Sequence, residues 1–271
     1  MSLRVNTNIA AMNAYRNLTA TDSMMSKSLE KLSSGYRINR AADDAAGLSI
    51  SENLRSQVGG LKVAVRNAQD GISVVQTAEG ALTETHAILQ RMRDLAVQAS
   101  NTGSQDSTAR TAADTEVTQL TAELDRIATS TKFGNQVLLA GSFSGAFQVG
   151  ANAGELITIS VSTPMTASGL GVNGVSLLNS ASSALANIDS AISAVSTARA
   201  NLGAYQNRFE HTINNLNVAV ENLSASESRI RDTDMAQEMV SFTRSQILTQ
   251  AGTSMLSQAN QSSQGVLSLL K

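Results

Sequence analysis

The stretch that decides the fold is SQILTQAGTSMLSQANQSSQGVLSLL, residues 245–270, which contains no charged side chain. Most of its other positions hold amides and hydroxyls, so the stretch is too polar to cross a bilayer. A helix of a soluble monomer normally keeps a charged face, so we expect this helix to be buried among copies of the same chain, or in a chaperone groove beforehand. Its apolar residues recur mostly at gaps of three and four, as on one helical stripe: Leu248, Ala251, Met255, Ala259, Val266 and Leu270.

The composition of the 271 residues argues against several classes of protein. The net charge is −2 and charged residues make up 15%, below the usual share of about 25%, so no strong field indicates nucleic acid or a membrane surface. The chain has no cysteine, which removes disulfides, thiolate catalysis and cysteine-ligated metals. With aromatics at 3%, the core must be aliphatic, which suits helix-on-helix packing.

No membrane or targeting segment is expected. The N-terminus, MSLRVN, lacks the apolar region of a Sec-type signal peptide, and the sequence has no run of about 18 apolar residues that would form a transmembrane helix. An exported protein with this N-terminus would need another route.

Residues 5–36 are expected to form a helix that pairs with the C-terminal helix. Gly35 ends it, because glycine tolerates a left-handed cap. A heptad seam runs along it through Tyr15, Leu18, Met25, Leu29, Leu32 and Tyr36, with Asp22 as its one polar member.

Two charged connectors lie next to the terminal helices, one in each half of the chain, at 37–47 and at 229–234. The plain interpretation is a solvated connector with a local ion pair, and an exposed pair contributes only about 0–1 kcal/mol. The adjacent carboxylates at 43 and 44 resemble a catalytic pair, but nearby arginines favour a structural role. We interpret as an inter-domain joint the residues Arg37, Arg40, Asp43, Asp44, Arg231 and Asp234.

A long helical signal runs from residue 48 to about 100. Val75, Leu82, Leu89 and Ala96 recur in it at every seventh position, which indicates coiled-coil packing. Interior glycines cost about 1 kcal/mol each relative to alanine, which requires close approach of a neighbour or a break near 59–60. After a turn at 101–104, a shorter helix returns antiparallel. Its apolar residues are Val117, Leu120, Leu124 and Ile127.

Beyond residue 134 the apolar period changes to two, which predicts short strands at 137–139, 146–149 and 157–161. Residues 164–174 lack periodicity and are expected to be a loop at the tip of the molecule. From residue 181 the chain is helical again. The predicted fold is therefore mainly α: a long antiparallel coiled-coil bundle with paired N- and C-terminal helices and a small β-hairpin at about 137–161.

Signals for chemistry are weak. The stretch GLGVNG at 169–174, with Asp189 beyond it, matches the dinucleotide pattern, but that mechanism requires a parallel βαβ unit, and a flexible loop is the better interpretation. His86 and His211 are far apart and have no paired ligand spacing. No G-x-S-x-G elbow occurs. We predict no catalytic residue, no cofactor and no metal.

One surface stripe carries more weight. Arg91, Leu95 and Gln98 are spaced i, i+4, i+7, which points them away from the face of the heptad repeat. An exposed leucine between polar residues is common by accident. The functional interpretation is a contact surface for another subunit or a partner.

The chain resembles the bacterial flagellins. Matching stretches cover roughly residues 1–160 and 180–271, too long for chance agreement. They are VNTN (5–8), LSSGYRIN (32–39), DDAAG (43–47), RNAQDGIS (66–73), TAEGAL (77–82), LQRMRDLAVQ (89–98), QILTQAGTSML (246–256) and VLSLL (266–270).

The resemblance implies a secreted, extracellular filament subunit for swimming motility, exported through the flagellar type III apparatus. It implies an inner coiled-coil domain from residues 1–40 and 235–271, and a helical rod domain at 41–234 with the hairpin and a short variable loop at about 164–178. The implied partners are further copies in a helical homopolymer, a chaperone at the C-terminal helix, and cap and hook-junction proteins. The large outer domains of many flagellins are missing, which predicts a thin, smooth filament.

The resemblance also implies recognition by the flagellin-sensing Toll-like receptor, through positions that match Arg91, Leu95, Gln98 and Glu116 here. Two other classes of function remain open from the residues alone. One is a membrane-active amphipathic helical protein, for which cationic faces and aromatic anchors are expected. The other is an enzyme that uses the glycine-rich stretch at 169–174.

Overall fold

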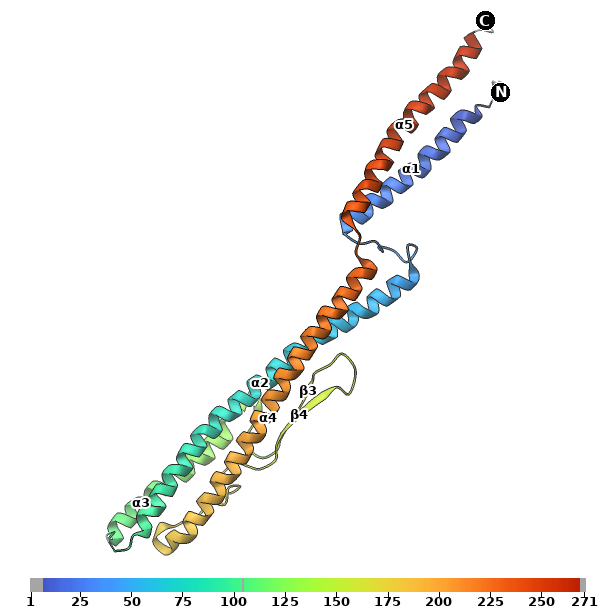
Figure 1. The fold of residues 1–271 in the computed structure, drawn as a ribbon. Coiled ribbons are helices and arrows are strands. Elements are labelled where there is room, and N and C mark those ends of the chain that lie inside the picture. Colours follow the sequence, from blue (N-terminus) through green and yellow to red (C-terminus); the bar gives the residue numbers. More distant parts are fainter. Residues whose placement is uncertain (1–6, 104, 269–271) are drawn as a thin grey trace. The chain divides into compact units, whose positions relative to one another are not determined.

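The computed structural model describes residues 7–103 and 105–268, and they group into two compact units. Unit 1 is drawn from residues up to 56 and from 222 onward, and unit 2 comprises 57–221. Both are mainly helical, with two small antiparallel sheets in unit 2, which confirms the predicted fold class (Figure 1).

In unit 1, the helices α1 (Ile9–Ser34) and α5 (Met235–Ser268) run antiparallel to each other. The Asn8 side chain donates to the Ala259 carbonyl at 2.9 Å near one end, and Lys31 pairs with Glu238 at 3.9 Å near the other. Asn8 also caps α1, accepting from the Ala11 amide at 3.0 Å. Gly35 ends α1 with φ +75°, the left-handed cap that the sequence predicted.

Only half of the predicted heptad positions of α1 face α5 in the structure. Leu18, Met25 and Leu32 are half-buried as expected. The alternate positions inside are Thr21 and Ser28, with exposures of 8% and 6%, rather than Asp22 and Leu29. The Thr21 hydroxyl donates to the Asn17 carbonyl of its own helix at 2.8 Å, so its burial leaves no unpaired donor. Tyr15, Leu29 and Tyr36 are exposed.

The α5 side of this seam consists mostly of small or polar residues as well, with Leu256 as the exception. Its inward positions are Ser245, Thr249, Gly252, Leu256 and Ala259. A Cβ on Gly252 would lie 3.3 Å from the Leu18 side chain, so glycine lets the two helices approach closely. The apolar stripe predicted at 248, 251 and 255 is therefore not the intrachain seam.

In unit 2, parts of α2 (Ala45–Ser100) and α4 (Leu177–Arg231) supply a core that repeats every seven residues. Within 57–100, the predicted Val75, Leu82, Leu89 and Ala96 are all fully buried, and α2 continues through 59–60 without a break. Ile188, Val195 and Leu202 of α4 are buried too, and α3 (Ser107–Ser130) adds the predicted Val117 and Leu124.

The strands differ from the prediction in one place. A hairpin pairs β3 (Phe143–Gln148) with β4 (Leu156–Val161), in the register Phe143↔Val161. The predicted strand at 137–139 is wrong: β2 (Gln136–Val137) pairs with β1 (Lys132–Phe133) and ends there. Leu138 and Leu139 are fully buried core residues outside any strand.

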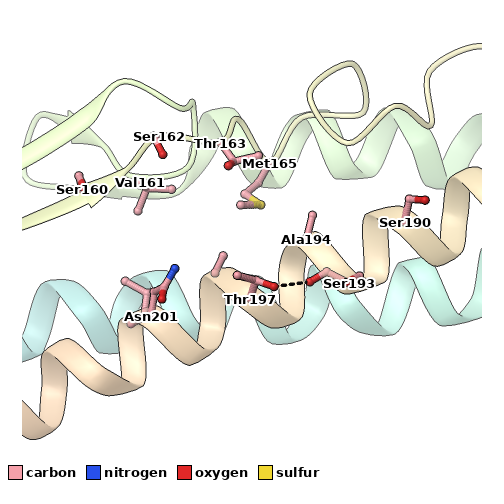
Figure 2. Close-up of a pocket in the computed structure, with 12 residues that line it drawn as sticks. Ser160, Val161, Ser162, Thr163, Met165, Ser190, Ser193, Ala194, Thr197 and Asn201 are labelled. Carbon is pink, nitrogen blue, oxygen red and sulfur yellow. Dashed lines mark hydrogen bonds between the residues drawn. The ribbon is translucent and has the colours of Figure 1, made fainter.

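The segment 164–174 is not a free loop at a tip. Met165, Ala167 and Val172 are buried, and Figure 2 shows the Met165 side chain directed toward α4. The Met165 amide donates to the Leu139 carbonyl at 2.9 Å, and the Ala167 amide donates to the Asp125 carboxylate at 2.8 Å. Short-range periodicity does not detect such a segment, because its partners are distant in sequence.

Candidate assembly and contact surfaces

The outward face of α5 carries the predicted C-terminal stripe. Leu248 and Met255 are 47% and 60% exposed, and Ala251 is exposed as well. Ile247, which the prediction missed although it adjoins Leu248, is 60% exposed. The predicted side chains of Val266 and Leu270 lie outside the described part of the chain.

A shallow hollow of about 520 Å³ lies within this face of α5. It is lined by Met239, Val240, Thr243, Arg244, Ile247 and Leu248. Ile247, Leu248 and Met255 of α5 thus lie outside its intrachain seam. This face suits burial against another molecule, since apolar patches of this kind mark interaction sites.

The outward face of α1 carries a second set of apolar side chains. Tyr15 and Leu29 are 64% and 57% exposed, and Asp22 lies midway between them in the sequence. The other predicted heptad residues Leu18, Met25 and Leu32 are half-buried and belong to the intrachain seam. Periodicity alone grouped the two stripes into one.

The carboxylates of the predicted joint cap backbone turns. Asp43 accepts from the Arg40 and Asn39 amides at 3.1 and 3.2 Å. These hydrogen bonds, from Arg40 first and Asn39 second, lower the pKa of the Asp43 carboxyl from its ordinary value. Asp44 accepts from the Gly47 amide at 2.8 Å at the start of α2, and Asp234 accepts from the Ala236 amide at 2.9 Å at the start of α5.

The arginines of the joint reach beyond the predicted cluster for their partners. Arg37 donates its backbone amide to the Arg231 carbonyl and a guanidinium N–H to the Ile230 carbonyl, both at 2.7 Å. Arg40 pairs with Glu30 at 2.8 Å. The expected local ion pair within the connector is thus replaced, for Arg40, by an ion pair with Glu30 of α1.

Arg231 is the most enclosed arginine of the joint. Its side chain is 13% exposed, pairs with Glu52 at 2.5 Å, and lies 4.8 Å from the centre of the Tyr36 ring. The Thr233 amide donates to the Gly35 carbonyl at 3.0 Å beside it. Sequence spacing did not indicate Glu52, because only the fold brings it to Arg231.

Only part of the predicted receptor stripe is exposed to solvent. Arg91 donates to Glu116 at 2.7 Å, and this hydrogen bond raises the pKa of Arg91 above its ordinary value. Arg91 and Gln98 are exposed, and Glu116 is half-buried. The expected exposure of Leu95 is wrong, because its side chain is only 3% exposed and belongs to the core of unit 2.

Unit 2 also holds a cleft of about 360 Å³ between α4 and the residues around the end of β4 (Figure 2). Hydroxyls such as Ser160, Ser162 and Thr163 face α4 residues such as Thr197 and Asn201, and no lining residue is charged. The cleft therefore offers no acid, base or cation for catalysis.

The glycine-rich stretch lacks the context that dinucleotide binding requires. Both described sheets are antiparallel hairpins, whereas the fingerprint needs a parallel βαβ unit. Within the described residues, no group of three or more His, Cys, Asp or Glu is placed to hold a metal. No helix in that same part is long and apolar enough to span a bilayer.

Comparison with known proteins matches both ends of the chain. The model of the bacterial flagellin N-terminal helical region matches residues 5–144, and that of the C-terminal helical region matches residues 185–270. Flagellin of Halalkalibacterium halodurans is 52% identical over 98% of this chain and 99% of its own length. Flagellin of Bacillus subtilis is 48% identical over 99% of this chain and 100% of its own.

Two further relatives agree with these matches. The flagellar filament 33 kDa core protein of Treponema phagedenis is 48% identical over 98% of this chain and 99% of its own length. The crystal structure of Bacillus cereus flagellin is 31% identical with a TM-score of 0.50, covering 56% of this chain and 88% of that one. The chain therefore belongs to the bacterial flagellin family.

Proposed function

We propose that this flagellin polymerises into an extracellular filament by burying the outward faces of its terminal helices against neighbouring copies. The observation that carries the proposal is the arrangement of α5. Its seam with α1 uses residues such as Ser245 and Gly252, while Ile247, Leu248 and Met255 remain 60%, 47% and 60% exposed. Membership of a family of filament proteins rather than enzymes supports the same reading.

The energetics favour an interface at this face. Burying a whole Leu, Ile or Met side chain contributes about 1.5–3 kcal/mol, so covering these half-exposed residues stabilises a contact by roughly 1–2 kcal/mol apiece. The seam positions Thr21, Ser28, Ser245 and Gly252 contribute less, because serine, threonine and glycine bury little apolar area. The terminal helices thus bury more apolar surface in a polymer than in a single chain.

The proposal is tested by seeded polymerisation followed by sedimentation and electron microscopy. The variant L248S/M255S and a chain ending at residue 250 should stay monomeric at concentrations where the unaltered chain forms filaments. Gln250→Ser, at an exposed polar position of α5, is the matched control and should polymerise normally. Filaments from the shortened chain would contradict the proposal.

The same α5 face fits the other partners that the family resemblance implies. A cytoplasmic export chaperone that covers this face would keep the subunit monomeric before secretion, and cap and hook-junction proteins would contact it at the filament ends. The proposed domains remain an inner coiled-coil domain formed by 1–40 and 235–271, and a helical rod domain formed by 41–234.

A second proposal concerns innate immune recognition. The exposed Arg91 and Gln98, together with the half-buried Glu116, form a surface that the flagellin-sensing receptor would contact. Leu95 takes no direct part in this proposal, because its side chain is enclosed in unit 2. Its role is to hold α2 in place beneath the contact.

A further inference from the structure

One charged side chain lies in the middle of the apolar face of α5. Arg244 lines the hollow of this face beside Val240, Ile247 and Leu248, which are 60%, 60% and 47% exposed. Within residues 7–103 and 105–268, Arg244 is exposed and has no ion-pair partner. If another molecule covers these apolar groups, the Arg244 guanidinium is buried with them. A buried cation is costly without a carboxylate partner, so the covering surface should supply one.

The outward stripe of α1 has the opposite arrangement. Tyr15, Asp22 and Leu29 follow one another at intervals of seven and are all exposed. Asp22 accepts a hydrogen bond from the Thr249 hydroxyl at 3.3 Å. That neutral contact leaves the charge of the carboxylate unbalanced and its other acceptor positions available.

The hollow that Asp22 borders is acidic on balance once Asp22 itself is counted, because its other charges cancel. The hollow has a volume of about 540 Å³, and its other charged residues are Lys27, Glu30, Arg40 and Asp43. Glu30 and Arg40 pair with each other at 2.8 Å, and Asp43 accepts two backbone amides. Three carboxylates thus face two cations in this hollow, which favours one additional cation.

We propose that α5 of one copy docks on the α1 stripe of a second copy, with Arg244 of the first paired to Asp22 of the second. This inference rests on the proposed polymerisation and specifies its contact. Each stripe has apolar residues on both sides of a single charge, and the two charges are opposite. A lone charged pair in an apolar seam sets register, and complementary charges select the partner surface and its orientation.

The pairing also accounts for open-ended growth. The α5 face and the α1 stripe are different surfaces of the same unit, so each copy offers one of each. A contact between two different surfaces is heterologous, and it continues indefinitely when the rotation does not close a ring. A contact of α5 with α5 would instead end in a closed dimer.

Charge reversal in the full chain tests the proposal. Arg244→Glu and Asp22→Arg should each raise the critical concentration for elongation of sonicated filament seeds by about tenfold or more. The double variant R244E/D22R restores the opposite charges and should return the critical concentration to within about threefold of the unaltered chain. Thr249→Val removes the hydroxyl that contacts the Asp22 carboxylate and the Ser245 carbonyl within one chain, and it should polymerise normally.

Lys62→Glu is the control for net charge, because Lys62 is an exposed residue of α2 without an ion pair in the described part of the chain. Single reversals that polymerise like the unaltered chain, or a double variant as poor as the worse single, overturn the Arg244–Asp22 contact while leaving polymerisation intact. An unaltered chain that never elongates seeds overturns the proposed function as well.

Discussion

Phe209 on α4 packs its ring against the bare Cα of Gly71 on α2. A Cβ at residue 71 would lie 2.7 Å from the Phe209 Cζ atom, closer than side chains approach. Phe209 is fully buried and meets the Phe147 ring edge-on, with the centroids 5.7 Å apart. The interior glycine of a long helix thus provides the space for the largest fully buried side chain among the described residues.

Gly71→Ala should therefore destabilise the protein although alanine favours helix. Overpacking costs about 1–3 kcal/mol against a propensity gain of about 1 kcal/mol, so we expect the free energy of unfolding to fall by about 1 kcal/mol. Gly80→Ala is the matched control, since its Cβ would meet nothing within 4 Å, and it should raise stability by up to about 1 kcal/mol. Urea unfolding measures both, and equal effects at the two sites would contradict the close packing.

Asp125 anchors the segment 164–174 by accepting from the Ala167 amide at 2.8 Å. Asp125→Ala should lower the free energy of unfolding by about 1–3 kcal/mol, because the amide is left without its charged acceptor. Amide hydrogen exchange at Ala167 should accelerate. Asp70→Ala, at an exposed position inside α2, has the same effect on helix propensity and should leave that exchange rate unchanged.

The pKa of Asp43 is lowered by the hydrogen bonds that its carboxylate accepts from the Arg40 and Asn39 amides. Its charged form therefore stabilises the turn at 39–43 above its ordinary pKa of about 3.9, and this contribution is lost as the pH falls through the lower pKa of the folded chain. NMR titration should show Asp43 titrating below exposed aspartates, with the Arg40 amide shift following it. In Asp43→Asn that amide should no longer respond, and a response that persisted would point to another group.

Arg91→Ala should reduce activation of the flagellin-sensing receptor by about tenfold, as expected for an arginine at a protein contact. Its ion pair with Glu116 is exposed, so its loss should change the free energy of unfolding by less than about 1 kcal/mol. Leu95→Ala should instead destabilise unit 2 by about 2–5 kcal/mol, since the side chain is buried. Reporter-cell activation and thermal unfolding, measured together, separate the two effects, and motility is scored separately because the surface also fits subunit contacts.

Prediction from sequence succeeded where burial repeats regularly. The predicted heptad of α2 was confirmed, because a helix that packs along its whole length must place an apolar residue inward every seventh position. It was wrong at Leu95, which lies on a second buried face toward the rest of unit 2. A helix that packs between two neighbours has two buried faces, and a single heptad repeat predicts only one of them.

What the sequence by itself determined is the set of helices, their antiparallel return and the family, because these depend on periodicity, caps and long local motifs. Only the tertiary structure decided which face each helix turns inward. On α1 it placed Thr21 and Ser28 in the seam and left Tyr15 and Leu29 outside, and on α5 it left Leu248 and Met255 uncovered. The physical reason is that periodicity relates positions within one helix, whereas burial depends on how closely a neighbouring helix packs. Here α1 and α5 approach closely because Gly252 of α5 has no side chain facing Leu18 of α1.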